Sequence, residues 1–176
     1  MEDAEAARLV LAGDRDGVTH VIESYRMDVY NASLRILGNT ADAEDVTQDT
    51  FVAALQRMST YDPKQAMGPW LRAIARNRAI DLLRRRARAP EPELARGPSV
   101  ETVAIDRLEA ERVRAALAQL PTRDRTLLVL RYWEDQPVES VARSLGMTDG
   151  AARVALLRAR RALGALLARE ESGVEV

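Results

Sequence analysis

The sequence predicts an all-α protein: two small helical domains joined by a flexible linker, the second containing a helix-turn-helix. Leu, Ala, Arg and Glu recur at helical spacing in nearly every window, whereas Val, Ile and Thr form no alternating run typical of a strand. Three prolines and a glycine cluster in APEPELARGPS, where the helical periodicity stops. The chain of 176 residues is long enough for two modest cores. We therefore expect a first domain at 1–88, a linker at 89–111, a second domain at 112–170 and a tail at 171–176.

The first domain is expected to hold helices near 3–12, 15–37, 41–57 and 69–87. In the third of these, Asp42, Glu44 and Asp45 fall in the first turn, where the helix dipole favours negative charge. Pro69 suits the start of the fourth, because the first N–H groups of a helix have no partner within it.

The second domain is expected to follow a helix that begins within 99–111. Pro121 and Thr122 open a helix predicted to reach about Trp133, and a short helix at 138–144 comes next. Gly146 can supply a left-handed turn, and Thr148 can cap a last helix that runs to about 167. This order predicts the helix-turn-helix.

Charge divides the chain into alternating blocks. There are 26 basic and 27 acidic residues in total, but residues 69–88 carry seven arginines and one acid, and residues 112–163 carry ten basic and five acidic groups. Residues 1–58 and 89–111 are acidic. The pattern favours separate surfaces for an anionic polymer and for a cationic partner.

Several function classes are excluded by what the sequence lacks. It has no cysteine and only one histidine, His20, and we find no phosphate-cradling loop or nucleophile motif. We therefore expect neither an enzyme nor a cofactor or metal site. There is no signal peptide and no apolar run that could insert in a membrane, so a cytoplasmic protein is expected.

Three segments are candidate binding surfaces, each with an ordinary alternative. The fourth helix carries Asn77, Asp81 and Arg84 on one polar stripe, which suits nucleic acid or is a solvated basic face. Before it lies STYDPKQAMG, where an aromatic beside a basic helix could stack on an unpaired base, although Trp70 is more often a core residue. The acids of the third helix could bind arginines of another protein or be a solvated helix start.

The helix-turn-helix is a fourth candidate surface. Around Asp149, where a helix would enter the major groove, lie five arginines: Arg143, Arg153, Arg158, Arg160 and Arg161. The alternative for this surface is contact with another protein.

Three blocks together resemble the extracytoplasmic-function sigma factors, which are small initiation factors of bacterial RNA polymerase. They are DAEDVTQDTF at 42–51, YDPKQAMGPWLRAIARNRAIDLLRRR at 61–86 and LPTRDRTLLVLRYWEDQPVESVARSLGMTDGAARVALLRARRAL at 120–163. The resemblance implies an alternative sigma factor of the sigma-70 family. Its first domain binds core RNA polymerase and the minus-10 element, and its second reads the minus-35 element of promoter DNA. An anti-sigma factor is the family's usual regulator and is expected as a partner.

The resemblance also implies roles for single residues. Core polymerase would be bound by Asp45, Gln48 and Asp49, and the loop 59–68 would hold a base flipped from the non-template strand. The minus-10 contacts would be Tyr61, Trp70, Arg76, Asn77, Asp81 and Arg84. The minus-35 contacts would be Arg143, Thr148, Asp149, Arg153, Arg158, Arg160 and Arg161.

The recognition helix departs from the family pattern, with Ala151, Ala152, Arg153 and Ala155 where base-reading groups are common. Arg153 and Arg158 are therefore expected to carry more of the specificity. The rival hypothesis is an autonomous helix-turn-helix regulator whose first domain only dimerises or binds a ligand. The acidic third helix, the helix after Trp70 and the acidic linker argue against it.

Overall fold

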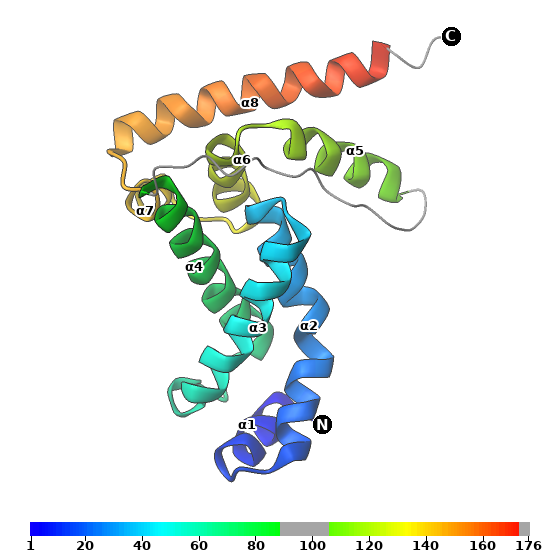
Figure 1. Cartoon of the computed structure of the whole chain (residues 1–176), viewed down its shortest axis with the longest axis vertical. Helices are drawn as coiled ribbons and strands as arrows, with labels where there is room; N and C mark the ends of the chain where they lie inside the picture. The colour runs from blue at the N-terminus through cyan, green and yellow to red at the C-terminus, as the bar shows by residue number, and fades with distance from the viewer. Residues whose placement is uncertain (89–105, 173–176) are drawn as a thin grey trace. The chain divides into compact units, whose positions relative to one another are not determined.

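The computed structural model describes residues 1–88 and 106–172, and its regular elements in these ranges are all helical (Figure 1). In chain order they are α1 (Asp3–Leu11), α2 (Arg15–Leu37), α3 (Thr40–Gln56), the 3-10 turn η1 (Met58–Thr60), α4 (Met67–Arg88), α5 (Asp106–Gln119), α6 (Thr122–Leu128), the π turn η2 (Val129–Trp133), α7 (Val138–Ser144) and α8 (Asp149–Ser172). Within these ranges, one unit consists of residues 1–34 and 40–88, and the other of residues 35–39 and 106–172. The predicted all-α class with two helical domains is confirmed.

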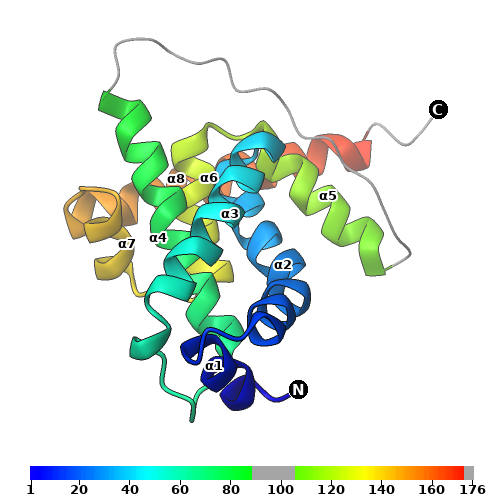
Figure 2. The same cartoon turned by 60° about the horizontal axis from the view of Figure 1, so that its bottom comes forward.

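The core of the first unit lies among α1 to α4, and α3 packs along α4 (Figure 2). Val21 and Val29 of α2, Phe51 of α3, and Leu71 and Ala75 of α4 are all buried. They recur at helical spacing, so each helix turns one apolar stripe inward and leaves the opposite face to solvent.

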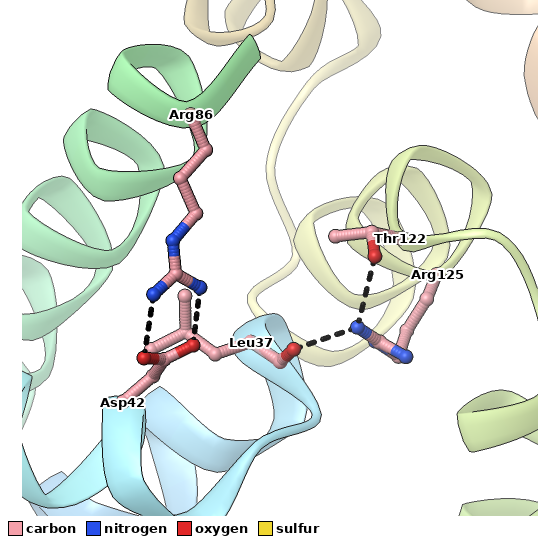
Figure 3. Close-up of polar contacts among 5 residues, drawn as sticks. All are labelled: Leu37, Asp42, Arg86, Thr122 and Arg125. Atoms are coloured by element: carbon pink, nitrogen blue, oxygen red, sulfur yellow. Dashed lines mark hydrogen bonds and ion pairs between the residues drawn. The ribbon is translucent and has the colours of Figure 1, made fainter. Parts of the chain in front are cut away.

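An ion pair fastens the start of α3 to the end of α4 (Figure 3). The guanidinium of Arg86 donates to both carboxylate oxygens of Asp42, with 2.8 Å between Nη2 and Oδ1. Asp42 is buried, whereas its position in the first turn of α3 predicts a solvent-exposed acid. Because the side chain of Arg86 is 39% exposed, solvent screens the pair, which ties α3 to α4 without the full energy of a completely buried ion pair.

α1 crosses α2 at Gly17 with no room for a side chain. A Cβ added there would lie 2.6 Å from the Cβ of Leu9, 2.8 Å from the amide nitrogen of Val10 and 2.9 Å from the carbonyl oxygen of Ala6. Two of these atoms belong to the backbone, so the crossing requires glycine.

The second unit is built around α8, against which α5, α6 and α7 pack. Gly146 has φ of 63°, and the amide of Ala151 donates to Oγ1 of Thr148 at 3.2 Å. The predicted left-handed turn and helix cap are therefore both present. Val141 and Ala142 are buried behind the turn, as the helix-turn-helix pattern requires.

Some boundaries differ from those expected. The helix opened by Thr122 does not continue as an α-helix to Trp133: it changes at Val129 to a π turn, in which the amide of Glu134 donates to the carbonyl of Val129 at 3.0 Å. In this wider turn Val129 is buried and Trp133 is exposed. The α-helical periodicity alone does not predict this arrangement. α8 extends to Ser172, beyond the expected 167, because no helix breaker intervenes.

α4 begins at Met67, which makes Pro69 its third residue. Residues 89–105 of the predicted linker and residues 173–176 of the predicted tail lie outside the described residues. The last six residues of the expected linker, 106–111, belong to α5.

We expect Gly17→Ala to lower the free energy of unfolding by about 1–3 kcal/mol, because the added methyl group forces α1 away from α2. Gly164→Ala is the matched control, since Gly164 lies in α8 with no atom within 4 Å of an added Cβ. It should raise stability by up to about 1 kcal/mol through helix propensity. Urea unfolding followed by circular dichroism measures both, and a Gly17→Ala protein as stable as the wild type would contradict the close crossing.

Candidate nucleic-acid interface

The polar stripe of α4 is solvent-exposed, as the sequence predicts. Asn77 and Asp81 lie on the exposed face, and the guanidinium of Arg84 approaches the carboxylate of Asp81 at 3.4 Å. Arg76 is half-buried on the same helix. The inward face of α4 buries Ala75 and Ala79, so a packed helix holds the stripe in place.

The loop before α4 does not present Tyr61 as the exposed aromatic that the sequence suggested. Tyr61 is only 6% exposed; its ring centroid lies 5.2 Å from that of Trp70, and its hydroxyl donates to the carbonyl of Gln65. Burial raises the pKa of Tyr61. Trp70 is half-buried and packs on the same core. The two rings therefore form the inner support of the loop.

Asp3 of α1 anchors the other end of this loop, a role that sequence reasoning missed. One carboxylate oxygen accepts a hydrogen bond from the Tyr25 hydroxyl at 2.5 Å, and the other accepts from the amide of Met67, the first residue of α4, at 2.8 Å. Burial, followed by the hydrogen bond to Asp3, raises the pKa of Tyr25 to about 12, so its hydroxyl remains a donor at neutral pH. Met67 is 64 residues from Asp3, and no periodic pattern indicates such a contact.

The predicted acidic surface of α3 is exposed at Asp45, Gln48 and Asp49. Beside it lies an open pocket of about 340 Å³ between α2 and α3, lined by Arg26, Met27, Tyr30, Glu44, Thr47 and Gln48. Met27 is 63% exposed, which is unusual for methionine in a helix that also builds the core. The α2 residues of this pocket were not among the predicted contacts.

In the second unit α8 presents its arginines to solvent. Arg153, Arg158, Arg160 and Arg161 are exposed, as is Arg143 at the end of α7. Arg153 forms an ion pair of 3.2 Å with Glu139 of α7, and the guanidinium of Arg160 lies 5.9 Å from the ring of Tyr132. Thr148 uses its hydroxyl as the helix cap, and Asp149 is exposed at the first turn.

The outward face of α8 differs from the one expected. The family pattern predicts base-reading positions at Ala152 and Ala155, but they are 0% and 3% exposed and pack inward with Leu156 and Ala159. The outward positions include Val154 instead, at 59% exposure, and Leu157, at 47%. The alanine spacing of three and four residues was the signal that could have predicted this.

Other kinds of site are not found in the described ranges. Across residues 1–88 and 106–172, no three acidic or histidine side chains converge as metal ligands. In the same ranges, no helix combines the length and the apolar character needed to cross a membrane.

Comparison with protein families matches both units. Residues 21–89 match Sigma-70 region 2, and residues 110–163 match Sigma-70, region 4. The ECF RNA polymerase sigma factor BldN of Streptomyces coelicolor is 30% identical over 179 residues, which cover 94% of this chain and 68% of that protein. The RNA polymerase sigma factor CnrH of Cupriavidus metallidurans is 36% identical over 140 residues, 72% of this chain and 73% of that protein.

Solved structures show the same fold. CnrH in complex with the cytosolic domain of CnrY has a TM-score of 0.53 at 28% identity, covering 95% of this chain and 97% of that one. The sigma factor RpoE in complex with the anti-sigma factor NepR from Bartonella quintana has a TM-score of 0.54 at 21% identity, covering 90% and 98%. The family matches and relatives confirm the resemblance read from the residues: this chain belongs to the extracytoplasmic-function sigma factors of the sigma-70 family.

Proposed function

We propose that this sigma factor works in the bacterial cytoplasm, where it binds core RNA polymerase and directs promoter recognition, DNA melting and transcription initiation without catalytic activity of its own. The observation that carries the proposal is the pair of exposed polar and arginine-bearing helix faces, on α4 in one unit and on α8 in the other. Such faces favour an anionic polymer as ligand.

Core polymerase binds the exposed side of α3. The carboxylates of Asp45 and Asp49 and the amide of Gln48 suit a basic partner surface, and the pocket beside Gln48 adds the exposed apolar side chain of Met27. A charged rim around an apolar centre is the usual composition of a protein interface. This surface lies on helices that also build the core, so it is rigid before binding.

The minus-10 element binds the α4 stripe and the adjoining loop. Asn77 offers both a donor and an acceptor to a base edge, and Asp81 orients the guanidinium of Arg84 toward the strand. Arg76 adds positive charge for the backbone. Tyr61 and Trp70 act from beneath, because the contact between their tilted rings fixes the loop that receives the flipped base.

The minus-35 element binds α8 through its outward arginines. Arg153 and Arg158 are placed for base edges, whereas Arg143, Arg160 and Arg161 are placed for phosphates. Thr148 contributes as the helix cap, which fixes where α8 begins, and Asp149 follows it as the first residue.

Regulation by an anti-sigma factor is supported by the fold shared with RpoE, which is solved in complex with the anti-sigma factor NepR. An anti-sigma protein would compete with core polymerase for the surfaces described above.

Run-off transcription on genomic promoter DNA tests the proposed function. Specific transcripts should require both core enzyme and this protein, and the protein alone should bind duplex DNA weakly, because its contacts are divided between two small units. Sequence-specific footprints at nanomolar concentration without polymerase would instead support the autonomous regulator.

Asp49→Arg should weaken association with core polymerase about tenfold or more, because a like charge then faces the basic partner surface. Glu5→Arg is the matched control: it makes the same change of charge on the exposed side of α1 and should leave association unchanged. Binding is measured with labelled core enzyme, and circular dichroism checks that both variants fold. Equal affinities for the two variants would remove α3 from the interface.

Asn77→Ala should reduce open-complex formation and leave the closed complex nearly unchanged. Base flipping costs a few kcal/mol, which contacts to the flipped base must offset. A template with a pre-melted minus-10 bubble should therefore recover much of the loss, as measured by permanganate reactivity of unpaired thymines. Gln119→Ala, an exposed amide on α5, is the control. Equal defects on linear and bubble templates would point to strand binding or folding and contradict a role in melting.

A further inference from the structure

The solvent-facing side of α8 is apolar at its centre. Val154 is 59% exposed and Leu157 is 47% exposed. The two residues are three positions apart in the helix, so they are neighbours on one surface. Gly150 lies one turn before Val154, and an added Cβ there would meet no atom within 4 Å. The start of this face is therefore open, and a ligand can approach the backbone closely.

Positive charge surrounds this apolar centre. Arg153 and Arg158 flank Val154, and Arg161 lies two turns beyond it, all of them exposed. An open recess of about 470 Å³ borders the same face, and its lining includes Met147, Ala151, Val154 and Arg158 together with Arg123 and Asp124 of α6. A ligand that matches this surface carries negative charge at its edges and an apolar group in the middle.

The major groove of duplex DNA has this composition. Phosphates form its two edges, and base pairs offer hydrogen-bond donors and acceptors inside it, with one apolar group, the C5 methyl of thymine. Val154 has no hydrogen-bonding group in its side chain, so it cannot read the polar pattern of a base. Its side chain can contact apolar groups, and the C5 methyl of thymine is the one that distinguishes a base pair in this groove.

We propose that Val154 is a specificity-determining residue that contacts the C5 methyl group of a thymine in the minus-35 element. The inference rests on the proposed function, since it requires α8 to enter the major groove. Valine is branched at Cβ and has one strongly preferred rotamer in a helix, so its two methyl groups are fixed before DNA arrives. Arg153 and Arg158 then contact the neighbouring base edges or phosphates.

The test uses holoenzyme reconstituted from the full chain and core polymerase. Duplexes with a pre-melted minus-10 bubble of fixed sequence and a randomised minus-35 region are selected for binding. Selected duplexes are then resynthesised with deoxyuridine in place of each thymine in turn, which removes only the methyl group. We expect one position at which deoxyuridine weakens binding about fourfold, the fold-change that corresponds to ~0.8 kcal/mol for one buried carbon group.

Three variants assign that effect to one side chain. Val154→Ala should bind the thymine and deoxyuridine duplexes equally, and Val154→Ile should keep the difference, because it retains a branched apolar group. Leu11→Ala is the matched control: Leu11 is 60% exposed on α1, and its loss should leave the fourfold ratio intact. The ratio compares two duplexes on one protein, so a general loss of folding does not change it.

Each contrary outcome is distinct. If the wild type selects a defined minus-35 sequence but deoxyuridine has no effect at any position, the role of Val154 is wrong and the proposed function stands. If no minus-35 sequence is selected, the second unit does not read DNA and both fail. If Val154→Ala keeps the fourfold ratio and weakens core association, the face binds protein, which overturns the proposal.

Discussion

The close approach of helices along alanine faces is the constraint on which both units depend. The alanines at the helix contacts are each 0% exposed: Ala43, Ala54, Ala75 and Ala79 in the first unit, and Ala116, Ala142, Ala152 and Ala159 in the second. Distances between helix axes depend on the side chains at the contact, and a methyl group allows a short one. Aromatic residues are only 4% of the chain, so aliphatic side chains such as Ile36, Leu71 and Leu127, all fully buried, fill the space between these alanines.

The same constraint places the functional side chains. α4 buries Ala75 and Ala79 and so turns Asn77 outward, and α8 buries Ala152 and Ala159 and so turns Arg153 outward. A group on a packed helix is held more accurately than a group on a loop, because the core fixes both the rotation and the height of the helix. The loop before α4 compensates with two internal supports, the contacting rings of Tyr61 and Trp70 and the carboxylate of Asp3.

Sequence reasoning succeeded where the determining contacts are local. The left-handed Gly146 and the capping Thr148 follow from residues only a few positions apart, as does the helical class itself. It could not find the Arg86 pair with Asp42, because its partners are 44 residues apart and each resembles an ordinary surface charge. Ala155 was misplaced for another reason: its position was compared with the family pattern, whereas the spacing of the neighbouring alanines turns it inward.

The ion pair between Arg153 and Glu139 has a consequence for the thermodynamics of DNA binding. The guanidinium already holds a carboxylate, so a base edge that binds it must replace an anionic acceptor with a neutral one. This exchange costs only about 0–1 kcal/mol, because the ion pair is exposed. The released carboxylate then lies in a strongly negative field and attracts a cation from solution. That uptake partly cancels the entropy gained when phosphates release their counter-ions. Glu139 thereby lowers the affinity of α8 for DNA in general, and a sequence is favoured only where a well-placed acceptor replaces the carboxylate.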